Sequence, residues 1–336
     1  MLSFIPDPLL APIFAVLMGV AMLLYAVLDG FDLGVGILLR AAPEEAERDR
    51  MVASVGPFWD ANETWLVLGI GLLLVAFPRA HGIILTALYV PVALMLAGLI
   101  LRGVAFEFRV KAFAHQKPRW DFAFQAGSVL AAAAQGFMLG SYILGLRTDL
   151  LAWLFAAACA VGVVGGYALL GATWLVWRTD DALQRRAVRW ARIAMLFCVI
   201  GIVIVSAATP LASAEIFARW FRFPELLMLA PVPLATGACV LVAWLMLARL
   251  PRADHGLDWV PFAATVGVVV LCFQGLAYSF WPYVVPGRLT IWQAASAPES
   301  LRFILVGTAI VLPLILVYTA FVWRVFGGKA GGLRYE

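Results

Sequence analysis

The chain has 336 residues, of which 64% are hydrophobic and only 13% are charged, and its mean hydropathy is +0.96. A soluble domain carries about a quarter charged residues, so this composition cannot cover a water-facing surface. The net charge of +4 does not indicate nucleic-acid binding, because the basic residues lie in short loops between apolar runs and form no basic domain with interleaved aromatic residues. The composition predicts an all-α polytopic membrane protein.

Apolar runs of the length needed to cross a bilayer, about 20 residues, recur along the whole chain. The opening MLSFIPDPLL lacks the basic region of a cleavable signal peptide, so the first run is expected to remain as a span. Because the loops are short, we expect one integral membrane domain over 1–336, with nine spans at 9–38, 57–77, 82–101, 123–146, 150–177, 193–213, 226–248, 259–283 and 303–326.

The distribution of basic residues predicts the orientation of these spans. An odd number of spans places the two ends of the chain on opposite sides of the membrane. With the N-terminus outside, 18 of the 24 Lys and Arg residues fall on the cytoplasmic side and 6 on the outer side. The positive-inside rule therefore predicts an outer N-terminus and a cytoplasmic C-terminus.

Acidic residues interrupt the first three spans near their expected cytoplasmic ends. Asp29 and Asp32 lie one helical turn apart in LDGFDLGVG, and Asp60 and Glu63 open the second span in GPFWDANETW. Glu107 follows the third span in LRGVAFEFRVK. An i, i+3 spacing puts each pair on one helix face, and a carboxylate stranded in lipid costs several kcal/mol. We therefore expect these five acids to meet inside protein and to exchange protons as a relay.

Neighbouring residues support such a cluster. Arg102 and Asn62 lie at the same expected depth and are candidates to satisfy the buried acids. Gly30 and Gly34 form a G-x-x-x-G pattern, which lets another helix backbone approach closely beside the acids.

A simpler interpretation stays open at this stage. Residues 9–28 are long enough to span, so Asp29 and Asp32 could lie solvated at the headgroup level. Asp60 and Glu63 would then be partners of the helix dipole at the start of the second span. Tryptophans such as Trp59 and Trp65 are more often interfacial or packing residues than cofactor contacts.

The placement of the histidines and cysteines makes this chain a poor candidate to hold haems or a metal cluster by itself. His81, His115 and His255 lie in or beside loops, and no two share a span, whereas a b-type haem commonly needs axial His or Met ligands. The four cysteines show no C-x-x-C spacing. We expect no metal ligand here and assign no cofactor-binding residue; any redox metal would come from a partner.

Two adjacent motifs, LDGFDLGVGILLR and GPFWDANETWLV, resemble the signature of subunit II of cytochrome bd-type quinol oxidases. The likeness extends through LRGVAFEFRVK, FWPYVVPGRLTIWQAAS and LPLILVYTAFVWRVFG, nearly from end to end. It implies nine transmembrane helices in two four-helix bundles plus one additional helix. Ala61, where many members have glycine, and the short chain are similar to the cyanide-insensitive branch; many members also have Asp in place of Glu107.

The resemblance also implies cofactors and partners. The partner is a haem-bearing subunit I with two haems b and either haem d or a third haem b, joined in some members by a small single-span subunit. For some members, the resemblance also implies a structural quinone bound to subunit II. The complex oxidises quinol in the bacterial cytoplasmic membrane and reduces oxygen to water with cytoplasmic protons. Acids matching Asp29, Asp32, Asp60 and Glu107 are implied to help deliver those protons.

Two other classes of function remain as alternatives. A proton-coupled transporter also places acids inside the membrane, but inverted repeats and helices broken near the midplane are typical of transporters, and neither is evident in the sequence. A purely structural subunit, without a proton relay, is the other alternative.

Overall fold

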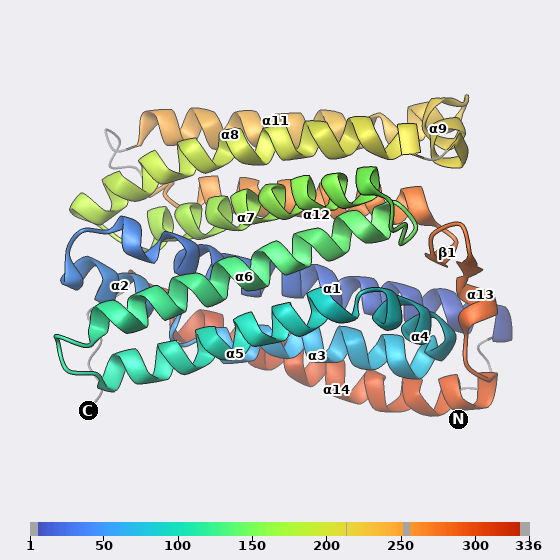
Figure 1. Cartoon of the computed structure of the whole chain (residues 1–336), viewed down its shortest axis with the longest axis horizontal. Coiled ribbons are helices and arrows are strands. Elements are labelled where there is room, and N and C mark those ends of the chain that lie inside the picture. Colours follow the sequence, from blue (N-terminus) through green and yellow to red (C-terminus); the bar gives the residue numbers. More distant parts are fainter. Residues whose placement is uncertain (1–5, 213, 251–255, 330–336) are drawn as a thin grey trace.

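The computed structural model describes residues 6–212, 214–250 and 256–329. Within these ranges, nine helical segments are long and apolar enough to cross a membrane, which confirms the expected all-α polytopic class. They lie side by side along the long axis of the molecule (Figure 1). The helices that form them are α1 (Asp7–Leu38), α3 (Trp59–Ala76), α5 (Tyr89–Lys111), α6 (Lys117–Ile143), α7 (Leu150–Arg178), α8 (Asp181–Ala212), α10 (Glu225–Leu229) with α11 (Pro231–Arg249), α12 (Val260–Phe280) and α14 (Pro298–Val325).

Short elements cap the two ends of the bundle. One end carries η1 (Leu39–Ala41) and α2 (Glu45–Val55), and the other carries α4 (Pro78–Ala87), α9 (Ala214–Phe221) and α13 (Ile291–Ala294) (Figure 1). A hairpin of two antiparallel strands, β1 (Tyr283–Val285) and β2 (Leu289–Thr290), precedes α13, with Tyr283 opposite Thr290. Since α1 begins at the α13 end and α14 finishes at the α2 end, the helical part of the chain starts and stops at opposite ends.

Two expected spans differ from the observed helices. The span expected at 82–101 is divided: residues up to Ala87 belong to α4, and α5 begins at Tyr89 and continues ten residues past the expected end, to Lys111. The span expected at 193–213 begins at Asp181, because an Arg-rich segment continues the helix beyond the apolar run; residue 213 lies outside the described residues. Hydropathy locates the apolar stretch of a helix, whereas its polar ends are set by local hydrogen bonding.

The loop residue Asp149 determines where α7 begins. Its carboxylate accepts a hydrogen bond from the backbone N–H of Ala152, at 3.2 Å, and lies 2.8 Å from Arg147 Nε. This N–H, which the first turn of the helix leaves without a backbone partner, holds the pKa of the Asp149 carboxyl below its usual range, and Arg147 adds to the effect.

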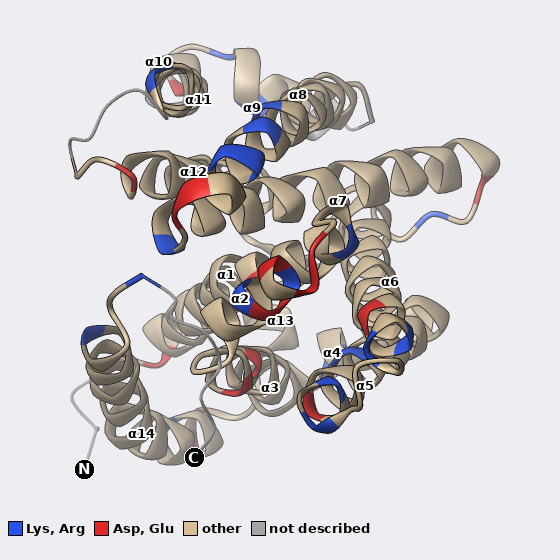
Figure 2. Cartoon of the chain, turned by 90° about the vertical axis from the view of Figure 1, so that its left-hand side faces the viewer, with Lys and Arg blue, Asp and Glu red and all other residues tan. Residues whose placement is uncertain are grey.

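The helix α1 lies at the centre of the structure and packs against α3, α6 and α7. A second group of contacts joins α7, α8, α11 and α12, while α14 runs along the edge of the molecule (Figure 2). The crossing of α1 and α7 is very close: a Cβ atom on Gly34 would lie 1.9 Å from the carbonyl oxygen of Tyr167, and one on Gly171 would lie 2.2 Å from the carbonyl carbon of Gly34. The G-x-x-x-G pattern therefore serves the approach of α7, and Gly30 receives the ring of Tyr167.

Candidate functional site

A buried arginine joins the first three spans near the α2 end of the bundle. Arg102 of α5 donates from Nη1 to Asp29 Oδ1 of α1 at 2.5 Å and from Nη2 to Glu63 Oε2 of α3 at 3.0 Å. The side chain of Arg102 is 2% exposed and that of Asp29 is 0% exposed, whereas Glu63 keeps 30% of its side chain exposed. The pair of Arg102 with Asp29 is thus inside the protein, and Glu63 connects it to the surface.

The second acid of α1 has a neutral partner. Asn62 Nδ2 donates to Asp32 Oδ2 at 2.8 Å and also lies 3.4 Å from the carbonyl oxygen of Leu28. Asp32 is 1% exposed, and no described group makes a hydrogen bond to its Oδ1. The burial of Asp29 and Asp32 excludes, for these two acids, the interpretation that they are solvated at the headgroup level.

Uncharged polar side chains continue from this cluster into the bundle. Gln135 Nε2 of α6 donates to the hydroxyl oxygen of Tyr25 of α1 at 2.8 Å, and the hydroxyl of Tyr167 of α7 donates to Gln135 Oε1 at 2.7 Å. Tyr25 precedes Asp29 by one turn of α1, and its hydroxyl interacts with that carboxylate. We name the set of Asp29, Asp32, Glu63, Arg102 and Asn62 the acid cluster, and Tyr25, Gln135 and Tyr167 the amide–tyrosine chain.

Two of the five acids expected in the cluster lie outside it. Asp60 is exposed, and Glu107 is exposed with Lys111 Nζ at 3.8 Å as its ion-pair partner. The reason is helical phase: at about 100° per residue, Glu107 lies about 140° around α5 from Arg102, and Asp60 lies on the side of α3 away from Asn62. Asp60 still acts electrostatically on Glu63, which follows it by one turn.

The two tryptophans singled out in the sequence differ in position. Trp59 is partly exposed; its ring lies 5.1 Å from that of Phe106, and the guanidinium of Arg102 lies 5.9 Å from the Trp59 ring centroid. Trp65 is 1% exposed, and no described group accepts a hydrogen bond from its indole nitrogen. Trp59 therefore covers the acid cluster from the side, whereas Trp65 packs in the interior of α3.

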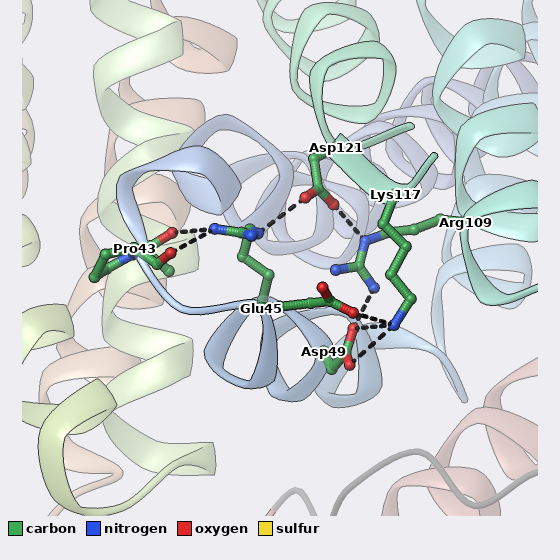
Figure 3. Close-up of polar contacts among 8 residues, drawn as sticks. Pro43, Glu45, Asp49, Arg109, Lys117 and Asp121 are labelled. Carbon is green, nitrogen blue, oxygen red and sulfur yellow. Dashed lines mark hydrogen bonds and ion pairs between the residues drawn. The ribbon is translucent and has the colours of Figure 1, made fainter. Parts of the chain in front are cut away.

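A second charged network, which the sequence did not reveal, anchors α2 (Figure 3). Arg109 of α5 donates to Asp121 of α6 and, through Nη1 at 2.7 Å, to Asp49 of α2. Lys117 of α6 lies 2.8 Å from Glu45 and 3.3 Å from Asp49. Charged residues gather on α2 and on the adjoining ends of α5 and α6 in Figure 2.

Two arginines complete this network. Arg48 Nε lies 2.9 Å from Asp121 Oδ2, and its Nη1 donates to the carbonyl oxygen of Ala42 at 2.8 Å. Arg186 of α8 lies 3.1 Å from Glu47, whose side chain is 1% exposed. Since α2 is short and polar, these ion pairs, rather than an apolar face alone, hold it against the ends of the spans.

The amide–tyrosine chain and the α2 network were both missed at the level of sequence. A signal for the first was present: Tyr25 shares the helix face of Asp29, and Gln135 is an amide in the middle of a long apolar run. For the second, Asp49 and Asp121 occur among other loop charges, and nothing in their spacing distinguishes them from solvated residues.

Comparisons with known proteins agree on one family. The family model described as "Cytochrome bd terminal oxidase subunit II" matches residues 10–326. Cytochrome bd-I ubiquinol oxidase subunit 2 of Escherichia coli (strain K12) is 28% identical over 357 residues, which cover 93% of each chain. Cytochrome bd ubiquinol oxidase subunit 2 of Bacillus subtilis (strain 168) is 27% identical over 322 residues, covering 88% of this chain and 90% of that one.

A solved structure has the same fold. A chain of the bd oxidase from Geobacillus thermodenitrificans superposes with a TM-score of 0.77 at 17% sequence identity, over 94% of this chain and 98% of that chain.

Proposed function

Because this chain belongs to the family of cytochrome bd terminal oxidase subunit II, we propose that it supports a haem-bearing subunit I and conducts protons toward it through the acid cluster. It is a multi-pass protein of the bacterial inner membrane and one subunit of a quinol oxidase, an oxidoreductase complex. The two roles proposed here explain what a subunit without its own redox metal contributes to that complex.

The donor set of this chain does not fit a haem. Among the described histidines, His81 lies on α4 and His115 lies between α5 and α6, at opposite ends of the bundle, and His255 is outside the described residues. Within the described ranges, no group of three or more His, Cys, Asp and Glu side chains is arranged to hold a metal ion. The haems that the family implies are therefore assigned to the partner subunit.

One observation carries the proton-conducting role: Asp29 and Asp32 are buried beside a single guanidinium. If both were ionised, the buried pair would hold one negative charge in excess of the guanidinium away from bulk water, and an ionised Glu63 nearby would add to the repulsion. Uncompensated charge is very costly there, so a carboxyl in such a site takes up a proton instead. At least one carboxyl of the cluster therefore carries a proton that it can exchange.

Glu63 supplies the connection to the outside of the chain. It is the one member of the acid cluster with a substantially exposed carboxyl, at 30%, and Asp60 lies one turn away on the surface. A proton taken up at Asp60 or Glu63 has a route past Arg102 to the buried pair. Glu107 is exposed on the neighbouring α5. We propose that it lies on the face that meets the partner subunit.

The orientation follows from the charge distribution. The sequence predicts 18 of the 24 basic residues on the cytoplasmic side, so we place the α2 end in the cytoplasm and the start of α1 outside. The acid cluster then lies in the cytoplasmic half of the membrane, because Asp29 and Asp32 are near the α2 end of α1. The helix contacts support two four-helix bundles, α1–α3–α5–α6 and α7–α8–α11–α12, with α14 as the additional helix.

The test is oxygen consumption by the purified heterodimer carrying Asp32→Asn, Glu63→Gln or Asp60→Asn. We expect normal haem content and a turnover lowered by about tenfold or more, since a lost proton-transfer group commonly costs that much. The matched control is Glu299→Gln, which removes an exposed carboxylate in the first turn of α14 at the opposite end of the bundle.

Other outcomes assign the acids differently. Wild-type turnover in all three variants would leave the chain a structural partner only. Loss of the complex, with no haem recovered, would make the substituted acid structural. Substrate uptake by the purified chain without a partner would instead favour a proton-coupled transporter.

A further inference from the structure

The amide–tyrosine chain links three helices that are far apart in sequence. Tyr25 lies on α1, Gln135 on α6 and Tyr167 on α7, and the two tyrosines are 3% and 8% exposed. Each of its two hydrogen bonds is shorter than 2.9 Å, and it ends beside Asp29. Polar groups in an apolar bundle are retained where they act on a neighbour, and the neighbour here is a buried carboxylate.

The bonds of this chain all point in one direction. The Tyr167 hydroxyl donates to the Gln135 carbonyl oxygen, and the Gln135 amide donates to the Tyr25 oxygen. Tyr25 accepts in that bond, so its own hydroxyl hydrogen is free to turn toward Asp29, which follows it by one helical turn and whose Oδ2 makes no hydrogen bond with a described group. Serial donors of this kind polarise one another and favour negative charge on the final acceptor.

The two acids of α1 therefore have unequal surroundings. Asp29 receives the guanidinium of Arg102 and lies beside the Tyr25 hydroxyl at the end of the donor chain, whereas Asp32 receives one neutral amide from Asn62; one oxygen of each carboxyl makes no hydrogen bond with a described group. Both are buried to the same degree. The difference between the surroundings of the two carboxyls therefore comes from their hydrogen-bond donors and not from burial.

We propose that Tyr25, Gln135 and Tyr167 are positioning residues that hold Asp29 as a permanent anion, so that the exchangeable proton of the acid cluster resides on Asp32. The functional meaning of this inference rests on the proposed proton conduction. The location of the proton, however, is a property of the acid cluster and can be measured separately. Asp29 and Arg102 then form a fixed ion pair, and only Asp32 changes its charge as protons pass.

Infrared spectroscopy of the purified heterodimer tests the proposal, because a protonated carboxyl has a C=O stretching band that a carboxylate lacks. Spectra are recorded across a titration from acid to alkaline pH. We expect one band from the cluster, absent in Asp32→Asn and retained in Asp29→Asn. In Tyr25→Phe, Asp29 loses its terminal donor, and we expect a second carboxyl band.

Tyr167→Phe removes the first donor of the series and is expected to change the spectrum in the same direction by a smaller amount. The matched control is Tyr142→Phe, which removes a tyrosine hydroxyl that donates to the carbonyl oxygen of Val284, far from the acid cluster. The charged and titratable groups that face the pair are Tyr25 from α1, Glu63 from α3, Arg102 from α5 and Tyr167 from α7.

A Tyr25→Phe spectrum identical to wild type, or a band that disappears with Asp29→Asn rather than with Asp32→Asn, overturns the proposal. Tyr25→Phe removes one oxygen atom and keeps the ring, so it remains informative if Asp29→Asn does not assemble. The infrared result is independent of turnover. Normal oxygen consumption in Asp32→Asn, Glu63→Gln and Asp60→Asn would refute proton conduction while leaving the assignment of the proton intact.

Discussion

Arg102 and Asp29 form an ion pair between α5 and α1 with Nη1 and Oδ1 2.5 Å apart, and neither side chain is more than 2% exposed. Among the described residues, these two helices are not one of the pairs that pack extensively against each other. The pair therefore fixes α5, and with it the face carrying Glu107, relative to the central helix.

Asp29→Asn is expected to destabilise the protein strongly, because it leaves the Arg102 guanidinium buried with Glu63 as its remaining ionic partner. Removing one partner of a buried pair costs about 3–5 kcal/mol. The measurement is thermal unfolding of the purified heterodimer. The double variant Asp29→Asn/Arg102→Gln should recover much of the loss, and equal melting temperatures for Asp29→Asn and wild type would contradict the structural role of the pair.

Gly34→Ala is expected to push α7 away from α1, since the new methyl group would lie 1.9 Å from the Tyr167 carbonyl oxygen. Backbone atoms cannot move aside as a flexible side chain does, so we expect a cost of about 1–3 kcal/mol or more. Gly71→Ala on α3 is the matched control, because nothing lies within 4 Å of its added Cβ. A thermal shift of the same size in both variants would show that the crossing is not close in the assembled protein.

The contribution of Asp149 to stability is expected to depend on pH. Its folded-state pKa is lowered by the Ala152 N–H, so the stabilisation is fully present above the ordinary pKa of an aspartate and is lost as pH falls through the lowered folded value. Asp149→Ala should therefore lower the melting temperature slightly at neutral pH and by less in acid. Asp149→Asn also caps a helix and does not titrate, so its stability relative to wild type should rise in acid by the same amount as that of Asp149→Ala.

Asp121→Asn is expected to loosen α2. Asp121 is 3% exposed and receives both Arg48 and Arg109, so its neutralisation leaves two arginines with weaker partners. Hydrogen–deuterium exchange should increase across Glu45–Val55 while remaining unchanged in α11. Glu44→Gln, an exposed position just before α2, is the control. Unchanged exchange in Asp121→Asn would show that apolar contacts hold α2 without the network.

Much of the architecture was determined by local sequence. The nine apolar runs identified the nine spanning segments because a bilayer demands length and hydrophobicity, and both properties are readable along one stretch of chain. The G-x-x-x-G at Gly30 and Gly34 is also a local pattern, and it indicated a close helix approach. It did not indicate that the approaching helix would be α7. The two motifs around Asp29 and Asp60 were enough to identify the family resemblance.

Tertiary structure decided which of the five expected acids belong to the acid cluster. Asp29 and Glu107 looked alike in sequence, each a carboxylate near the end of an apolar run, yet one is buried against Arg102 and the other is exposed. Which face of a helix turns inward depends on its rotation about its own axis, and this rotation is set by the neighbours that pack against it. Tyr25 and Gln135 are 110 positions apart in the sequence and come into contact because of how their helices are rotated and packed. No local sequence pattern encodes that rotation.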